Sequence, residues 1–282
     1  MFELWNATPN QDLAGLSPNA LAELLEDPFE ATDVLVFADV LSRPPRAPVV
    51  TVLTPLFETL VDGPAKATAS GYLPRALSVA IEERAFAQHG ASPFDVLRPK
   101  VTSESAFMGL HVARLVATFA GLIRKYRGAF QLTRKGRTLF ERRGMAGVYP
   151  ELLRAFTTRL EWSSLDGYPR ASILQASFAF SLVLLLRYGR TPRPGAFYAE
   201  RWLAAFPGID DAFGSSDPAR RDAGIALPTG TERFTHCYQV RVLQRFMGYF
   251  GLVEVRQERP GRIVSVCATP LLHDVVARRQ GG

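Results

Sequence analysis

Apolar residues recur at helical spacing along most of the chain, and proline or glycine marks where these stretches begin and end. Ser17-Pro18, Thr54-Pro55 and Thr269-Pro270 each place a hydroxyl before a proline, which suits the cap and the first position of a helix. With the glycine stops, the pattern predicts helices at 18–26, 55–61, 74–87, 104–120, 136–143, 150–161, 171–187, 194–206, 232–250 and 270–278.

Strands are predicted in few places, at 65–69, at 124–126 with 129–133, and at 252–256 with 262–268. Each of the last two pairs encloses a glycine-containing turn, so each is expected to form a hairpin. The sequence therefore predicts an α+β protein that is mostly α-helical.

Two parts of the chain share one order of elements: a long apolar helix, a Gly-Leu-Ile or Gly-Leu-Val step, a hairpin and a threonine-capped helix. The first passes through Gly121-Leu-Ile123 and Thr133, the second through Gly251-Leu-Val253 and Thr269. This is the order of the last helix and the wing of a winged helix, and the preceding helices supply the three that such a domain needs. We expect two winged-helix-like modules in tandem.

Domain boundaries follow from this repeat and from the proline- and glycine-rich stretches. Residues 1–50 are expected to form an acidic N-terminal arm and linker, 51–149 the first module and 150–282 the second. Within the second module, 207–230 is expected to be an inserted surface loop.

Charge is distributed unevenly along the 282 residues, whose net charge of +6 comes from 33 basic and 27 acidic residues. Residues 1–40 contain no Lys or Arg, and in 111–143 Glu141 is the only acid among many arginines and lysines. The arm could fold back on this basic segment and mask it, or both could be solvated surface.

Other classes of protein are disfavoured by the composition. Two cysteines, Cys237 and Cys267, provide neither a disulfide framework nor a full set of zinc ligands. The first residues lack the features of an export signal, so a cytoplasmic location is expected. The uncharged stretch 171–186 is too short and too polar for a bilayer span and is expected to be a core helix. No cofactor, metal or membrane partner is predicted.

The best candidates for contact with nucleic acid lie around the first hairpin turn, within fourteen residues. Guanidinium and ammonium groups on a hairpin can neutralise phosphates or enter a minor groove. The alternative is a basic hairpin that is only solvated. The candidates are Arg124, Lys125, Arg127, Arg134, Lys135 and Arg137.

The long helices offer mixed support for reading a major groove. On 232–250, Arg241 and Arg245 share a stripe with two tyrosines, and Gln244 lies beside it, so Arg241, Gln244 and Arg245 are candidates for base contacts. The alternative is a surface stripe whose tyrosines cover the core. On 104–120 the polar stripe is short and includes His111 and Arg114, which indicates a mostly buried helix.

Signals for catalysis are weak. The four histidines are scattered, and Asp166 precedes glycine, which is first a turn signal. Cys237 follows His236, but adjacent helical positions point in different directions, and small buried residues are the default interpretation of both cysteines. No enzymatic activity is therefore expected.

The sequence favours a nucleic-acid-binding protein, with DNA rather than RNA as the expected ligand and regulation as the role that would fit it. The second hypothesis is a non-catalytic protein-interaction module built on the same folds. A contiguous basic face across both hairpins favours the first, and a large exposed apolar patch favours the second. The oligomeric state is left open.

Several segments carry a family resemblance over nearly the whole chain. Lys66-Ala-Thr-Ala-Ser-Gly-Tyr-Leu-Pro74, Leu165-Asp-Gly-Tyr-Pro169, Gln175-Ala-Ser-Phe178 and Phe250-Gly-Leu-Val253 resemble an uncharacterised bacterial family. The middle part is similar to the C-terminal region of plasmid-encoded open-reading-frame-three proteins. The resemblance implies no activity, and the Cys-rich zinc motif fused to some relatives is lacking here.

Overall fold

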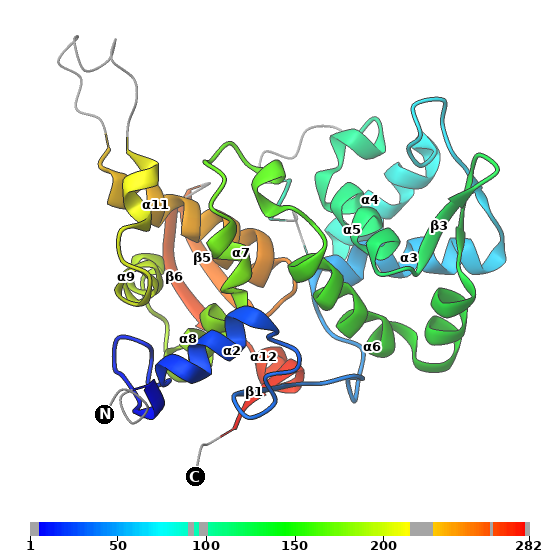
Figure 1. The fold of residues 1–282 in the computed structure, drawn as a ribbon. Coiled ribbons are helices and arrows are strands. Elements are labelled where there is room, and N and C mark those ends of the chain that lie inside the picture. Colours follow the sequence, from blue (N-terminus) through cyan, green and yellow to red (C-terminus); the bar gives the residue numbers. More distant parts are fainter. Residues whose placement is uncertain (1–5, 90–92, 96–100, 215–227, 260–261, 280–282) are drawn as a thin grey trace, which may run out of the picture.

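The computed structural model describes residues 6–89, 93–95, 101–214, 228–259 and 262–279. They form an α+β protein that is mostly helical, with a first unit (residues 48–143), a second unit (145–279) and an N-terminal arm (6–47) (Figure 1). The first unit consists of α3 (Pro48–Asp62), β2 (Ala65–Lys66), α4 (Arg75–His89), η1 (Glu104–Ala106), α5 (Met108–Phe119), β3 (Ile123–Tyr126), β4 (Ala129–Leu132) and the first part of α6 (Arg134–Thr158).

The second unit begins in α6, after Gly144 breaks that helix with a φ of 57°. It continues through η2 (Trp162–Leu165), α7 (Ser172–Ala176), α8 (Phe178–Tyr188), α9 (Gly195–Ala205), η3 (Ile209–Phe213), α11 (Gly230–Tyr238), the π-helical η4 (Gln239–Gly248), β5 (Val253–Arg259), β6 (Arg262–Ala268), α12 (Pro270–Val275) and β7 (Val276–Arg278). Much of the predicted inserted loop lies outside the described residues, and η3 falls in its described part.

Each unit contains a hairpin sheet with a further strand segment beside it. In the first, the order is β2-β4-β3, all antiparallel. In the second, β5 pairs with β6, and a single bridge joins Arg193 to Val266 on β6. In both units, a segment that comes before the helices leading into the hairpin pairs with the second strand of that hairpin. This segment is β2 in the first unit and Arg193 in the second.

The repeated order predicted from the sequence is present, and the same hydrogen bonds close it in both places. Gly121 ends α5 in the left-handed region, at a φ of 71°, and its carbonyl accepts a 2.6 Å bond from the Thr133 hydroxyl. Gly251 ends η4 at a φ of 69°, and its carbonyl accepts a 2.7 Å bond from the Thr269 hydroxyl. Thr133 also caps α6, whereas the Thr269 hydroxyl makes no cap bond to α12. We call each glycine-threonine pair an elbow.

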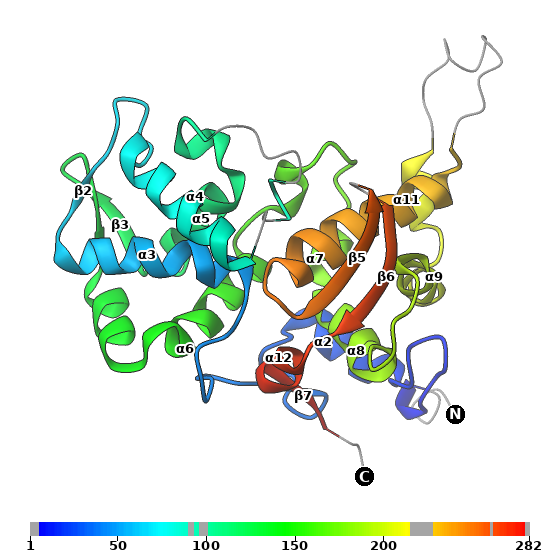
Figure 2. The ribbon, with the colours of Figure 1, turned by 180° about the vertical axis from the view of Figure 1, so that it is seen from behind.

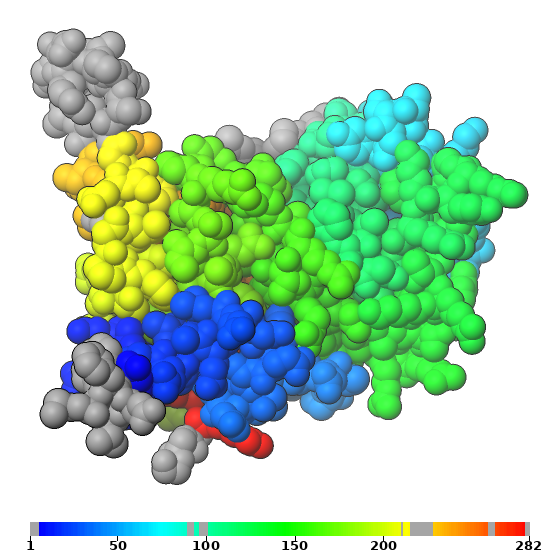
Figure 3. All heavy atoms as spheres, in the orientation of Figure 1, coloured from blue at the N-terminus to red at the C-terminus, as the bar shows by residue number. Residues whose placement is uncertain are grey.

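The N-terminal arm packs on the second unit and does not mask the basic segment. Its helix α2 (Pro18–Glu26), capped by Ser17, lies against α8, and its strand β1 (Leu35–Phe37) pairs antiparallel with β7. Figures 1 and 3 show the arm in blue along the second unit, away from the β3–β4 hairpin. Burial of side chains such as Leu24 and Leu35 fixes this position.

Several predicted helix boundaries are wrong, among them those between 136–143 and 150–161, which both fall in α6. Helix α3 begins at Pro48 and not at Pro55, which lies inside the helix. Proline is favoured at the first position of a helix, and Pro48 satisfies this preference as well as Pro55 would. Nine of the fifteen residues of α3 are buried, Pro55 among them, and this burial offsets the hydrogen bond that Pro55 lacks. The predicted 171–187 helix is interrupted at Ser177 between α7 and α8, and 270–278 is a short helix followed by β7.

Buried tyrosine hydroxyls form one hydrogen bond between the two units, from Tyr249, and one within the second unit, from Tyr149. Tyr249 donates a 2.6 Å bond to the carbonyl of Gly109 in α5, and Tyr149 donates one of the same length to the carbonyl of Phe250. Both rings are fully buried.

Within the described ranges, no helix combines the length and the apolarity needed to cross a bilayer, and the residues of α8 up to Leu185 are buried in the core.

We expect Thr133→Val to lower the free energy of unfolding by about 1–2 kcal/mol, because it removes both the cap of α6 and the bond to Gly121. Urea unfolding followed by circular dichroism measures the change. The control is Thr158→Val, whose exposed hydroxyl bonds only within α6. Equal stability of the two variants would contradict the role given to the elbow.

Candidate nucleic-acid interface

The β3–β4 hairpin lies at the end of the molecule opposite the two chain termini (Figures 1 and 2). Around its turn, Arg124, Lys125, Arg127 and Arg134 are exposed. None of these four makes an ion pair with a carboxylate of the described chain. Their charges are therefore available to an anionic partner.

The register of the sheet decides which side chains share its outer face. Ile123, Phe130 and Leu132 are buried, so they define the inner face. Because side chains alternate along a strand, Arg124 and Tyr126 lie on the outer face.

Paired residues share a face, so the outer face extends across the sheet. Tyr126 and Lys66 are both paired with Ala129, and Lys66 therefore lies on the same face as Tyr126. The sequence analysis did not place Lys66 or Tyr126 in this surface. The alternation of residues 123–126 places Tyr126 on the same face as Arg124. Lys66 is placed on that face only by the pairing of β2 with β4.

The tip of the hairpin holds an arginine in an uncommon backbone conformation. Arg127 has a φ of 48° and precedes Gly128 at 75°, so the two central residues form a turn of the kind that Asn-Gly favours. Left-handed backbone costs a non-glycine residue on the order of 1 kcal/mol. The guanidinium carbons of Arg127 and Arg124 each lie 5.2 Å from the centre of the Tyr126 ring.

Two of the predicted hairpin-flank cations are engaged in the fold. The Lys135 ammonium lies 2.8 Å from the carboxylate of Glu151 and 3.4 Å from the carbonyl of Ala120. Arg137 donates to the carbonyls of Leu60 and Val61 at the end of α3. Both side chains bind C-terminal carbonyls of helices, where a cation is favoured. Their first role is therefore structural.

Arg241 does not project toward solvent, which corrects its assignment to base contacts. Its side chain is 2% exposed and forms a two-pronged pair with Asp166, with bonds of 2.5 and 2.8 Å. It also donates to the carbonyl of Pro169. Desolvation lowers the pKa of Arg241, but the bonds to Asp166 outweigh it and the pKa is raised. Asp166 also accepts the N–H of Tyr168, which confirms the predicted turn.

Gln244 and Arg245 are likewise turned inward, so the predicted base-reading stripe is wrong. Gln244 is 6% exposed. Arg245 donates to the carbonyl of Leu165, and its guanidinium lies 5.4 Å from the centre of the Phe94 ring. Burial lowers the pKa of Arg245. The tyrosines of the stripe are fully buried, so the surface-stripe alternative is wrong too. A stripe of polar residues shows a shared face but not which way that face points.

A buried ionic cluster holds the first unit together behind the sheet. The carboxylate of Glu104 is fully buried, accepts a 2.7 Å bond from Arg114, and lies 2.8 Å from Nδ1 of His111. Its other oxygen accepts the N–H of Leu73 at 2.6 Å. The Arg114 guanidinium lies 4.7 Å from the ring centre of Phe130, on the inner face of the hairpin. The polar stripe of α5 is therefore internal, as the prediction of a mostly buried helix requires.

The cysteines occupy different environments. Cys237 is buried, and desolvation raises the pKa of its thiol to about 12, so it stays protonated at neutral pH. Cys267 is half-buried and donates to the carbonyl of Gly189. His236 contacts the Tyr168 hydroxyl instead of Cys237. Among the described residues, no three His, Cys, Asp or Glu side chains are grouped to hold a metal ion.

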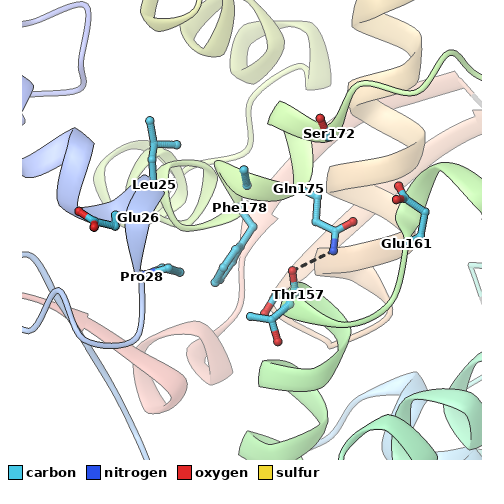
Figure 4. A pocket seen from close by; sticks show the side chains of 10 residues that line it. Leu25, Glu26, Pro28, Thr157, Glu161, Ser172, Gln175 and Phe178 are labelled. Atoms are coloured by element: carbon cyan, nitrogen blue, oxygen red, sulfur yellow. Dashed lines mark hydrogen bonds between the residues drawn. The ribbon is translucent and has the colours of Figure 1, made fainter.

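A shallow hollow of about 340 Å³ lies where the arm meets the second unit (Figure 4). Its central polar group is Gln175, whose amide donates to the carbonyls of Thr157 and Leu160. Its oxygen accepts the N–H of Trp162. Each of these amide atoms is therefore used within the fold, so the Gln175 side chain is not available to a ligand in this hollow.

Comparison with known protein families finds a match over part of the chain. Residues 46–145 match the family model described as the Y4jL N-terminal domain, an uncharacterised family. This span coincides closely with the first unit. No curated protein and no solved structure matches the chain.

We expect Asp166→Asn to cost about 3–5 kcal/mol of stability, because it leaves the buried Arg241 without its counter-ion. Thermal and urea unfolding measure the cost. The double variant Asp166→Leu/Arg241→Met should recover much of it, and Glu161→Gln, which breaks an exposed pair with Arg170, should cost at most about 1 kcal/mol. Wild-type stability in Asp166→Asn would return Arg241 to the candidate interface.

Acid should destabilise the protein partly through Glu104. Burial raises the pKa of this carboxyl, but the bonds from His111, Leu73 and Arg114 outweigh it and hold the pKa below its ordinary value of 4.5. Its contribution is complete above that ordinary value and is lost as the pH falls through the lower folded-state pKa.

The test is urea unfolding at several pH values between about 6 and 3. Glu104→Gln should be less stable at neutral pH and should lose less stability on acidification than the wild type. Glu58→Gln, which removes an exposed partner of Arg84, should follow the wild-type profile. Parallel profiles for the wild type and Glu104→Gln would show that Glu104 titrates alike in the folded and unfolded chain.

Proposed function

We propose that the protein binds nucleic acid, without catalysis, through the basic hairpin of its first unit. The observation that carries the proposal is the group of four exposed cations around the turn, Arg124, Lys125, Arg127 and Arg134, none paired with a described carboxylate. Such a surface suits the phosphates of a nucleic acid. Several closely spaced cations neutralise neighbouring phosphates and release the counterions condensed on them, which favours binding.

We further infer that each unit is a winged-helix module and that the hairpin is its wing. In the first unit, the order α3, β2, α4, α5, β3, β4 and the sheet order β2-β4-β3 support this assignment. In the second, α8, the bridge at Arg193, α9, α11 with η4, and β5–β6 follow the same order. The likeness is one of topology, and the binding proposal rests on the charges instead.

The two hairpins differ at matching positions, which confines the basic surface to the first. Counting from the elbow glycine, Arg124 corresponds to Glu254, and Tyr126 corresponds to Arg256. Glu254 and Arg256 are both exposed, so the second hairpin presents both signs of charge. The described residues therefore do not form the basic face across both hairpins that the sequence analysis named as favouring nucleic acid, and the proposal rests on the first hairpin alone.

The left-handed backbone at the tip supports a functional role for the arginine at position 127. Asparagine or glycine would hold the same turn at lower cost in backbone energy. The arginine at this position places a guanidinium at the turn of the hairpin. Strain that the fold does not need is a pointer to function.

The protein-interaction alternative rested on the apolar character of the 104–120 helix. Most of α5 is buried within the first unit, so its composition is accounted for without a partner. The exposed large apolar side chains lie on several different elements, among them Val36, Phe86, Phe119 and Val264. We therefore rank this alternative second.

The test is the affinity of the full chain for a mixed-sequence oligonucleotide, measured by fluorescence anisotropy between about 50 and 200 mM salt. The triple variant Arg124→Gln/Lys125→Gln/Arg127→Asn should bind about 10- to 100-fold more weakly at low salt, with a slope of log affinity against log salt reduced by about 2 to 3. Asparagine at 127 keeps the turn.

The matched control removes the same charge from the second unit, in Arg190→Gln/Arg201→Gln/Arg256→Gln, all exposed positions. It should bind like the wild type. Equal losses in both triple variants would reduce the effect to net charge, and no binding by the wild type at low salt would overturn the proposal in favour of a protein partner.

A further inference from the structure

An exposed tyrosine stands among the cations of the hairpin. Tyr126 is 49% exposed, although a ring of this size is usually mostly buried. It lies on the outer face of the sheet and faces away from the core defined by Ile123 and Phe130. Its ring therefore adds nothing to that core, and its position needs another explanation.

The surroundings of the ring combine cations with open space. Arg124 and Arg127 each place a guanidinium 5.2 Å from the ring centre. Directly opposite Tyr126 in the register is Ala129, whose methyl group leaves the ring uncovered on that side, and Lys66 follows on the next strand. An aromatic ring beside two guanidiniums, with a lysine two strands away on the same face of the sheet, suits a base with phosphates on either side.

Groups suited to reading base edges in a duplex are turned away from solvent. His111 and Arg114 on α5 converge on Glu104, and Arg241 is bound to Asp166. Gln244 is also buried. Beside its exposed guanidiniums, which suit phosphates and the minor groove, the basic hairpin offers an aromatic ring, and a ring contacts the face of a base. Base faces are accessible where bases are unpaired and unstacked.

We propose that the outer face of the β2-β4-β3 sheet binds single-stranded or locally unpaired nucleic acid. Tyr126 stacks on one base, while Arg124, Arg127 and Lys66 contact the flanking phosphates. On binding, the two guanidiniums exchange their exposed contacts with the ring for charge-assisted bonds to phosphate, which are the stronger interaction. This inference rests on the proposed function and specifies its ligand.

The experiment compares one fluorescein-labelled 20-nucleotide mixed-sequence strand, alone and annealed to its complement, with the full-length protein. The wild type should bind the single strand at least about 10-fold more tightly than the duplex. Tyr126→Leu should weaken single-strand binding by about 5- to 100-fold, the range that the loss of one stacked base predicts. The salt dependence should not change, because no cation is removed.

Two further variants separate stacking from other effects. Tyr126→Phe keeps the ring and should bind within about twofold of the wild type, since a phenyl ring also stacks on bases. Phe119→Leu removes another exposed aromatic ring of the same unit, at the end of α5, and should leave affinity unchanged. Unfolding curves of all three variants should match the wild type, because both positions are exposed.

The outcomes distinguish this inference from the function on which it rests. Wild-type affinity in Tyr126→Leu, or a preference of the wild type for the duplex, overturns the stacking assignment while the phosphate-binding proposal stands. Binding of neither oligonucleotide by the wild type overturns both. A loss in Tyr126→Leu that Tyr126→Phe restores supports the stacked base.

Discussion

The elbow at Gly121 is the constraint on which the candidate interface depends. A left-handed glycine ends α5, and the Thr133 hydroxyl bonds its carbonyl from the far end of the hairpin. The chain is thereby turned so that Leu122 and Ile123 enter the core, and the alternation of the strand then sends Arg124 and Tyr126 outward. Behind the sheet, the Glu104–Arg114 pair and the Phe130 ring hold the hairpin in this orientation.

The same elbow at Gly251 supports a hairpin of different chemistry. Its position equivalent to Arg124 is Glu254, and the helix before it directs Arg241 to the buried Asp166. The second unit also receives the acidic arm through α2 and β1. One copy of the repeated order thus presents cations to solvent, and the other uses its polar side chains for packing. A repeated scaffold does not require a repeated function.

Local signals in the sequence were sufficient for most of the fold. Ser17-Pro18 and the glycines after α5 and η4 marked true helix ends, and both hairpins lie where the turns predicted them. Pro55 misled because burial of α3 outweighs the local preference of proline. The β1–β7 pair was missed because three-residue strands, distant in the chain, have no periodic pattern of their own. The position of the arm was left open because opposite charge only suggested a contact, whereas apolar burial against the second unit decides it.

The candidate site was only half predictable for a related reason. Charge density correctly indicated the exposed cations around Arg127, but it could not separate them from Lys135, whose partner Glu151 lies 16 residues further along α6, beyond the break at Gly144. For Arg241 the partner is 75 residues distant, so the sequence alone gave no sign that the guanidinium is buried. Tyr126 became part of the site only through the register that places it opposite Ala129.

The most direct test of this account is to map where nucleic acid touches the chain. A 4-thiothymidine oligonucleotide can be photocross-linked to the full-length protein and the attached peptides identified by mass spectrometry. The account predicts attachment within residues 123–132, at the hairpin. Attachment within 230–250, where Arg241 and Gln244 are buried, or on the arm with none at the hairpin, would contradict it.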